Sequence, residues 1–349
     1  MTTLTQTAIL TRKIIRYGIF SIIAIIVLRM ILLTTIKIYK KIFPPPPPPP
    51  TVTFGKLPKL IFPKKDVPAN LTFTLETAEG GFPKLPVQAK IYFMPKLAAN
   101  LLSLDAAKTK AQSLGFKPEG QEISPTTYRF FQQSAPSTLE MNIILGIFSI
   151  SYDLKIDPSP LDVRPPAPEV AAANIRSFLS SANLLPSDLT GPTTHEFFKL
   201  QEGKFVSVLA LSESNLVKIN FFRKAYDNLP VLSSDSKSAN VWFMVSGVNE
   251  RGKQIIAAEY HYFPVDESQS STYPIKTAEA AWNDLGGEQV YIADSGSNKE
   301  GENIKIRRIY LAYFDPGEPA DFLQPIFVFE GDKGFLAYVP AVALEYYGE

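Results

Sequence analysis

The chain has 349 residues, of which 45% are hydrophobic and 20% charged, a composition typical of folded proteins and unlike that of a disordered chain. This length exceeds one comfortable hydrophobic core, so we expect two or three domains of roughly 100 to 150 residues each. The 30 prolines argue against a helical bundle. The absence of cysteine excludes disulfides and thiolate chemistry, and two histidines leave little material for a zinc site or a histidine base.

The formal net charge of +1 conceals an asymmetry along the chain. The first 41 residues carry seven basic residues and no acidic one, which leaves 28 basic and 34 acidic residues in the remainder. A mildly acidic body argues against nucleic acid as a partner, because nucleic-acid affinity comes mainly from clustered Lys and Arg side chains on phosphates.

Residues 18–36 form an apolar run, GIFSIIAIIVLRMILLTTI, in which Arg29 is the only charge. At 1.5 Å per residue the run covers roughly 28 Å, enough to span a bilayer. A cleaved signal peptide would have a shorter apolar run that ends in small residues, so the pattern favours a retained single-pass transmembrane helix behind a short tail, residues 1–17. Arg29 can reach the membrane interface by snorkelling or pair with the helix of a membrane partner.

Basic residues flank this helix on both sides, so the positive-inside rule determines its orientation weakly. We expect the N-terminus inside the cell membrane and the rest of the chain outside the cytoplasm. A short tail ahead of a lone anchor usually stays inside, and large folded regions translocate largely regardless of charge.

A basic and proline-rich stalk is predicted over residues 37–68. Its centre is an unbroken run of seven prolines, residues 44–50, which predicts a polyproline II rod of about 22 Å. A position next to the membrane favours a spacer over a docking site for an SH3- or WW-like partner. Residues 51–68 are expected to lie extended over the first domain.

Beyond the stalk, a helix followed by strands occurs three times. The first α+β module, residues 69–156, has a hairpin (71–77 with 87–93), a helix (102–116) and strands at 127–131, 138–145 and 147–154. A proline-rich linker follows at 157–168. Residues 169–349 hold two further modules, with helices at 169–185 and 274–287. Short connections predict antiparallel sheets with helices on one face, that is, an α+β fold. The sequence lacks a glycine-rich phosphate loop, which excludes nucleotide-binding folds, and we expect no cofactor.

The last module carries the segments YPIKTAEAAW (273–282), IYLAYF (309–314) and LQPIFVF (323–329). This order of helix, long strand and LQP strand resembles the tandem PepSY-like modules of bacterial extracytoplasmic proteins, particularly the membrane-anchored YycH and YycI regulators of a cell-wall sensor kinase. The similarity covers about 180 residues, from the linker to the C-terminus. The chain departs from these families in its seven-proline stalk and extra N-terminal module. The resemblance implies an inhibitory or modulatory role by contact, without catalysis.

The only sequence with the look of a catalytic motif is Asp294-Ser295-Gly296, which mimics the turn of aspartic peptidases. That chemistry needs two carboxylates sharing a proton, and the chain holds one such triplet, so a hairpin loop is favoured and a membrane-tethered peptidase remains an alternative. The same loop offers Asp294, Asn298, Glu300 and Glu302 as calcium ligands, but the spacing departs from that of an EF-hand, and no metal is expected. The acidic turn at 315–321 is expected to be solvated.

Aromatic residues are the more informative feature, because the chain has 24 Phe and 15 Tyr, many of them in clusters. Neighbouring residues on a strand point to opposite faces, so one of each consecutive pair should be exposed or covered by another module. This predicts interdomain packing or a surface for a peptide or membrane-protein partner. The predicted contact residues are Arg29 in the membrane and the aromatic residues Phe131, Phe222, Tyr262 and Tyr313.

We therefore expect a membrane-anchored, extracytoplasmic, non-enzymatic protein that binds a protein or peptide and regulates a membrane sensor. A structural scaffold of the cell envelope is the alternative.

Overall fold

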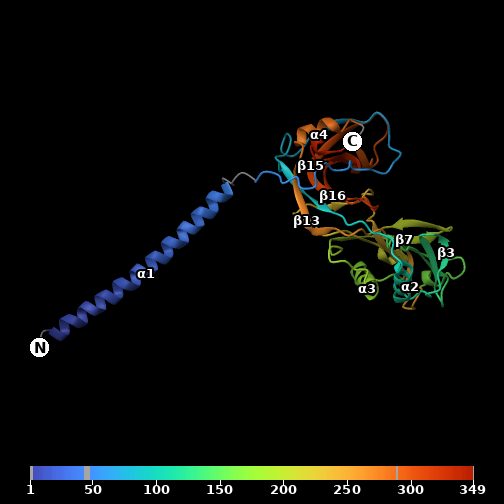
Figure 1. The fold of residues 1–349 in the computed structure, drawn as a ribbon, viewed down its shortest axis with the longest axis horizontal. Coiled ribbons are helices and arrows are strands. Elements are labelled where there is room, and N and C mark those ends of the chain that lie inside the picture. The colour runs from blue at the N-terminus through green and yellow to red at the C-terminus, as the bar shows by residue number, and fades with distance from the viewer. Residues whose placement is uncertain (1–2, 43–47, 288–289, 349) are drawn as a thin grey trace. The chain divides into compact units, whose positions relative to one another are not determined.

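The structure is a computed structural model that describes residues 3–42, 48–287 and 290–348. The chain forms two compact units, residues 1–49 and 50–349. The first unit is the single helix α1 (Thr3–Ile42), drawn in blue in Figure 1. Its segment Ile9–Tyr39 is long and apolar enough to cross a membrane, which confirms the predicted N-terminal apolar helix. Residues 44–47 of the predicted polyproline rod lie outside the described residues.

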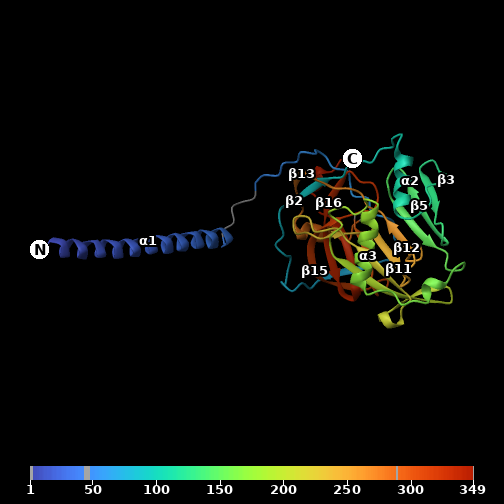
Figure 2. The same ribbon diagram turned by 90° about the horizontal axis from the view of Figure 1, so that it is seen from below.

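The second unit contains two sheets, and the larger one is a nine-stranded antiparallel sheet in the order β3-β4-β5-β6-β12-β11-β9-β7-β8. Its strands are β3 (Gln121–Ser124), β4 (Thr127–Phe131), β5 (Ser137–Asn142), β6 (Phe148–Tyr152), β7 (Thr193–Gln201), β8 (Lys204–Val208), β9 (Leu216–Phe221), β11 (Val241–Val245) and β12 (Ile255–Tyr260). The helices α2 (Ser103–Ser113) and α3 (Pro168–Ser181) pack on this sheet and share one hydrophobic core with it (Figure 2).

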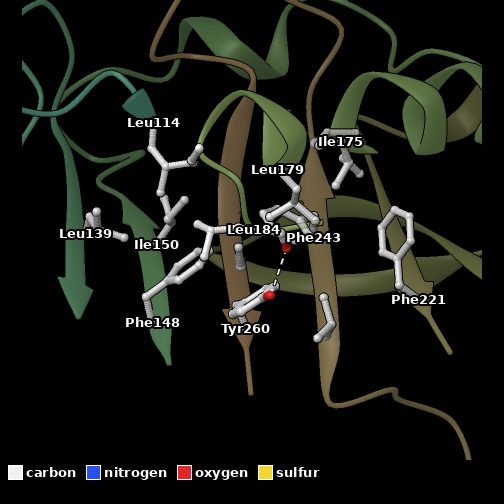
Figure 3. Packing of buried hydrophobic residues seen from close by; sticks show 14 of the residues in the cluster. Leu114, Leu139, Phe148, Ile150, Ile175, Leu179, Leu184, Phe221, Phe243 and Tyr260 are labelled. Carbon is white, nitrogen blue, oxygen red and sulfur yellow. Dashed lines mark hydrogen bonds between the residues drawn. The ribbon is translucent and has the colours of Figure 1, made fainter. Parts of the chain in front are cut away.

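The sequence of α3 explains how it covers the sheet. Ala171, Ile175 and Leu179 recur every fourth residue and form one buried stripe, and Pro168 starts the helix at a position where its missing N–H costs nothing. Figure 3 shows Ile175 and Leu179 beside Phe243 of the sheet. Just beyond the helix, the Leu184 carbonyl accepts a hydrogen bond from the buried Tyr260 hydroxyl at 2.8 Å (Figure 3).

The strands of the first and second predicted modules belong to the same sheet. Strand β6 pairs with β12, with Ile150 opposite Ala258. Residues 157–168, predicted as a linker between domains, connect β6 to α3 and include the 3₁₀-helix η1 (Ser159–Leu161). These residues therefore connect a strand and a helix that share one sheet and one hydrophobic core.

The second sheet has eight strands, with β1-β15-β16-β17-β14 in order, β10 beside β15, and β2 between β13 and β16. Its strands are β1 (Thr72–Leu75), β2 (Gln88–Phe93), β10 (Val231–Leu232), β13 (Asp266–Pro274), β14 (Tyr291–Asp294), β15 (Asn303–Phe314), β16 (Phe322–Gly331) and β17 (Leu336–Pro340). The short helix α4 (Ala278–Asp284) packs its buried Ala281 into the core of this sheet. The chain is thus of mixed α+β architecture, as predicted.

Of two expectations about the N-terminal segments, one is wrong and the other is only partly right. Residues 71–77 and 87–93 do not form a hairpin with each other: β1 pairs in parallel with β15, and β2 pairs antiparallel with β13. Residues 51–67, which we call the strap, lie on the eight-stranded sheet; Leu57 packs against Ile91 of β2, which belongs to the predicted first module, and against Tyr273 and Val342 of the last module. Leu57 bridges to Tyr347, and the ring of Phe62 stacks on that of Tyr291. Both errors have the same cause, since local alternation shows that a segment is extended but not which distant segment it joins.

Candidate functional site

A hollow lies between α2 and α3 on the nine-stranded sheet. It consists of two adjoining pockets of about 370 Å³ and 250 Å³, which have Asn174, Phe178, Asn249, Gln254 and Ile255 in common. We call this continuous hollow the helix groove. Its size and its place between helices are typical of binding sites.

The helix groove combines an apolar floor with a rim of carboxamides. Ile150 and Ile255 come from the adjacent strands β6 and β12, and Phe178 comes from α3. The carboxamides belong to four residues: Gln132, Asn174, Asn249 and Gln254. A carboxamide offers donors and an acceptor together, as a peptide backbone does. Nε2 of Gln254 donates to Oδ1 of Asn249 at 3.2 Å, and the other donors and acceptors of the rim suit the backbone of an extended peptide.

The turn between β11 and β12 forms one wall of the groove and depends on glycine. Gly252 has a φ of +88°, and a Cβ there would lie 2.6 Å from Nε2 of Gln132. The turn is closed by Ser246, whose hydroxyl donates to the Lys253 carbonyl at 2.9 Å. Only glycine combines this backbone conformation with so close an approach to the rim.

A buried polar cluster in the second unit joins the two sheets and lies outside the groove. Arg223, just after β9, donates to Asp188 at 2.5 Å and to Asp315 at 2.6 Å, and all three side chains are buried. Its guanidinium lies 4.4 Å from the ring centre of Tyr262, whose hydroxyl donates to Asp188. Burial alone would lower the pKa of Arg223, but the two carboxylates raise it above its usual value. The two carboxylates therefore keep the buried Arg223 side chain charged, and the cluster acts as a structural joint.

This joint corrects the expectation that the acidic turn at 315–321 is solvated. Asp315 is buried because Arg223 arrives from the other sheet to neutralise it. Asp321, by contrast, forms an exposed pair with Lys96 at 2.8 Å. A charged residue in a turn is usually exposed to solvent. It becomes buried when a residue of opposite charge, far away in the sequence, pairs with it.

The five predicted contact residues are scattered. Arg29 is exposed on α1, Phe131 is exposed at the end of β4, and Phe222 is half-buried after β9. Tyr262 is half-buried and engaged in the joint with Arg223. None of the five lines the helix groove.

Tyr313 is fully buried, so it has no surface to offer a partner. Its hydroxyl donates to the Lys90 carbonyl at 2.9 Å, and its ring packs against those of Tyr92 and Tyr226. Near its C-terminal end β15 is covered on both faces, so alternation along the strand exposes neither side. The sequence suggested either packing between domains or a partner surface for the aromatic clusters, and Tyr313 serves in packing.

The Asp294 turn is a structural loop among the described residues. Oδ2 of Asp294 accepts from Ser236 at 2.9 Å and lies 3.0 Å from Nζ of Lys237, and Oδ1 accepts from the Gly296 amide. Burial would raise the pKa of Asp294, but these three contacts outweigh it and lower the pKa below its usual value. Its charged neighbour is a lysine, where an aspartic peptidase needs a second carboxylate.

Residues of the same loop that could bind calcium are also engaged in other contacts. Glu302 pairs with Lys333 at 2.5 Å, and the Asn298 amide donates to the Ser295 carbonyl. Within residues 3–42, 48–287 and 290–348, no group of three or more His, Asp or Glu side chains gathers as a metal site would require.

The helix groove was missed by sequence reasoning because no motif marks it. Its carboxamides are separated along the chain and lie on a helix, a strand connection and a turn. Such residues are common on any polar surface, and only the pairing of β6 with β12 brings them together.

No protein-family model and no curated protein matches the chain. Among solved structures, an uncharacterized protein from Eubacterium rectale is similar, with 10% sequence identity and a TM-score of 0.34, over 79% of this chain and 84% of that chain. A likeness at this level assigns neither a family nor an activity.

Proposed function

We propose that this chain is a membrane-anchored, extracytoplasmic, non-enzymatic protein that binds a peptide segment of another membrane protein and thereby regulates a membrane sensor. The helix groove is the observation that carries the proposal. Its apolar floor would take one or two side chains of the peptide, and its carboxamide rim would pair with the peptide backbone.

The membrane part of the proposal rests on α1. Within the segment Ile9–Tyr39, residues 18–36 carry a single charge, Arg29, and apolar side chains on all sides of the helix. A helix that is apolar all round needs an apolar surrounding, which a bilayer supplies. We place its N-terminus in the cytoplasm and the second unit outside, for the reason that a short tail ahead of a lone anchor usually stays inside.

The proposal extends to the module type. Helices α2, α3 and α4 each precede antiparallel strands, and the LQP segment lies on the long strand β16. This order supports tandem PepSY-like modules similar to those of the YycH and YycI regulators. The sensor kinase that such regulators contact is then the class of partner to seek.

Site-specific crosslinking in living cells tests the proposal. The photoreactive residue p-benzoylphenylalanine replaces Ser177, an exposed residue of α3 that lines the groove, in the full-length chain. Ser180 is exposed on the same helix but does not line the groove, and it provides the matched control. We expect an adduct with a membrane protein at position 177 and at least fivefold less at position 180, with mass spectrometry identifying the attached peptide.

Two results would contradict the proposal. Equal adducts at the two positions would show that the groove is not the binding surface. Adducts with only this chain or with cell-wall material would favour the envelope scaffold.

Replacing residues 18–36 by an unrelated apolar helix of equal length then separates anchoring from regulation. Loss of sensor output with retained adducts would assign a regulatory contact to the membrane helix.

A further inference from the structure

A second hollow lies on the eight-stranded sheet, beneath the strap, and has a volume of about 400 Å³. We call it the strap cavity. Residues 59–67 of the strap form one wall, and the start of β14 together with Pro340 and Tyr347 forms the other. The cavity belongs to the second unit and shares no lining residue with the helix groove.

The strap cavity carries positive charge without a compensating acid. Lys59, Lys64 and Lys65 line it, and none of the Asp or Glu residues that the structure describes does. Nζ of Lys65 donates to the Ala293 carbonyl, whereas Lys59 and Lys64 form no ion pair within the part of the chain that the structure describes. An ammonium group that remains unpaired beside a hollow favours an anion there.

A buried hydroxyl provides the second observation. Tyr347 lines the cavity and is only 7% exposed, yet its hydroxyl has no hydrogen-bond partner among the described residues. Burial raises the pKa of Tyr347 above its usual value, so the hydroxyl keeps its proton and remains a donor. Buried polar groups are nearly always paired, so an unpaired hydroxyl on a residue that lines a cavity is suited to a ligand that accepts a hydrogen bond.

The rest of the lining is apolar and firmly held. Leu60, Phe62 and Ile292 contribute apolar walls. The ring of Phe62 stacks on that of Tyr291 with 5.1 Å between ring centres, and its edge meets Phe314 at 4.9 Å. A small inorganic anion would leave these walls without contact, so they favour a ligand with an apolar body.

We propose that the strap cavity binds an amphipathic anion, that is, a carboxylate or phosphate carried on an apolar body. Lys59 and Lys64 neutralise the anion, the Tyr347 hydroxyl donates to it, and the apolar walls take the body of the ligand. Because the lysines belong to the strap and Tyr347 follows the last strand of the sheet, the ligand ties the strap to the sheet. This site is separate from the peptide-binding function proposed for the helix groove.

Photolabelling of the full-length protein in phosphatidylcholine nanodiscs tests the proposal. The probe is 4-benzoylbenzoate, a carboxylate on a photoreactive apolar body, and its comparator is the neutral 4-benzoylbenzamide. We expect mass spectrometry to place the carboxylate label within residues 59–67 and 290–292, at least fivefold more strongly than the amide label. Equal labelling by the two probes, or labelling confined to α1, would overturn the proposal.

Competition identifies the source of the anion. Decanoate, decyl phosphate and inorganic phosphate are each added in excess before irradiation. Suppression by decanoate or decyl phosphate but not by inorganic phosphate is the expected result, and which of the two amphiphiles competes better distinguishes a carboxylate from a phosphate ligand. Suppression by inorganic phosphate alone would contradict the need for an apolar body.

Three variants separate binding from folding. The double substitution Lys59→Gln, Lys64→Gln should lower labelling at least fivefold, whereas Lys56→Gln, at an exposed strap lysine outside the cavity, should leave it unchanged. Tyr347→Phe removes only the unpaired hydroxyl, so it should lower labelling about threefold while the melting temperature stays equal or rises. Unchanged labelling in both Tyr347→Phe and the double variant would refute the site.

Discussion

Nε of Arg223 donates to Oδ2 of Asp315 across 2.6 Å, which joins the end of β9 in one sheet to the end of β15 in the other. The same guanidinium donates to the Phe263 carbonyl at 2.6 Å and to Asp188 at 2.5 Å. The contact between the sheets is therefore centred on a buried cation, each of whose three nitrogens donates a hydrogen bond. Apolar packing around Tyr313 accompanies it.

Asp315→Ala should destabilise the second unit by about 1–3 kcal/mol, because Asp188 still balances the Arg223 charge but the buried Nε–H of Arg223 loses its hydrogen-bond partner. Urea unfolding of the full-length protein, followed by tryptophan fluorescence, measures the change. Asp321→Ala is the control, since it removes an exposed pair with Lys96 and should cost less than about 1 kcal/mol. Similar costs for the two variants would show that the joint between the sheets does not depend on this ion pair.

Phe62→Ala should release the strap. The ring of Phe62 packs between Tyr291 and Phe314, and its loss should cost roughly 1–3 kcal/mol for a half-buried aromatic side chain. Hydrogen exchange should accelerate at the Leu57 amide, which donates to the Tyr346 carbonyl at 2.8 Å, while amides of α3 keep their protection.

Ile61→Ala is the matched control for the strap, because Ile61 adjoins Phe62 but is 83% exposed. It should leave the exchange of the Leu57 amide unchanged. Acceleration by both variants to the same degree would mean that the strap is held by its backbone and not by the Phe62 ring.

Local sequence patterns predicted where helices and strands lie better than they predicted which strands pair with each other. The apolar run predicted α1, and helical periodicity predicted helices at 102–116 and 169–185, where α2 (Ser103–Ser113) and α3 (Pro168–Ser181) lie. Pairings between distant segments were missed, such as that of β1 with β15, because a strand's own alternation fixes which side chains share a face but not which strand lies beside it.

The same limit applies to the sites. Asp315 and Arg223 are charged residues that a sequence places in solvent until a long-range pairing buries them together. Tyr347 is one of many aromatic residues, and only the position of the strap next to the C-terminus makes its hydroxyl part of a cavity.

Gly247→Ala should disturb the helix groove through the 157–168 connection. A Cβ at this position would lie 1.8 Å from the Arg164 carbonyl oxygen and 2.9 Å from Cγ1 of Val163. Because the nearest atom belongs to the backbone, the connection must move away, at a cost of about 1–3 kcal/mol. Arg164 and Gly247 both line the groove, so the crosslink from position 177 should weaken as well.

Gly286→Ala tests whether that effect is specific. Gly286 has open space around its Cβ position and no positive φ, so its replacement should change the free energy of unfolding by less than about 0.5 kcal/mol. The interpretation of the groove wall fails if Gly247→Ala matches this control in both stability and crosslinking.

His261 should make stability depend on pH near neutrality. Its Nε2 lies 3.2 Å from Oε2 of Glu259 and its Nδ1 lies 3.3 Å from the Gly317 carbonyl oxygen. The hydrogen bond with Glu259 is the main cause that raises the pKa of His261 above its ordinary value of 6.5, and burial opposes it only in part. Protonation is therefore favoured in the folded state, so the stabilisation is complete below pH 6.5 and is lost as the pH rises through the folded-state pKa.

His261→Gln should accordingly lower the free energy of unfolding at pH 5.5 and leave it nearly unchanged at pH 8.5. The loss should stay below about 1 kcal/mol, because His261 and Glu259 are both partly exposed and solvent screens their interaction. Urea unfolding at the two pH values measures it, and His195→Gln, at the exposed histidine on β7, controls for the loss of an imidazole. An equal effect of His261→Gln at both pH values would mean that the imidazole stabilises the fold by packing rather than by its charge.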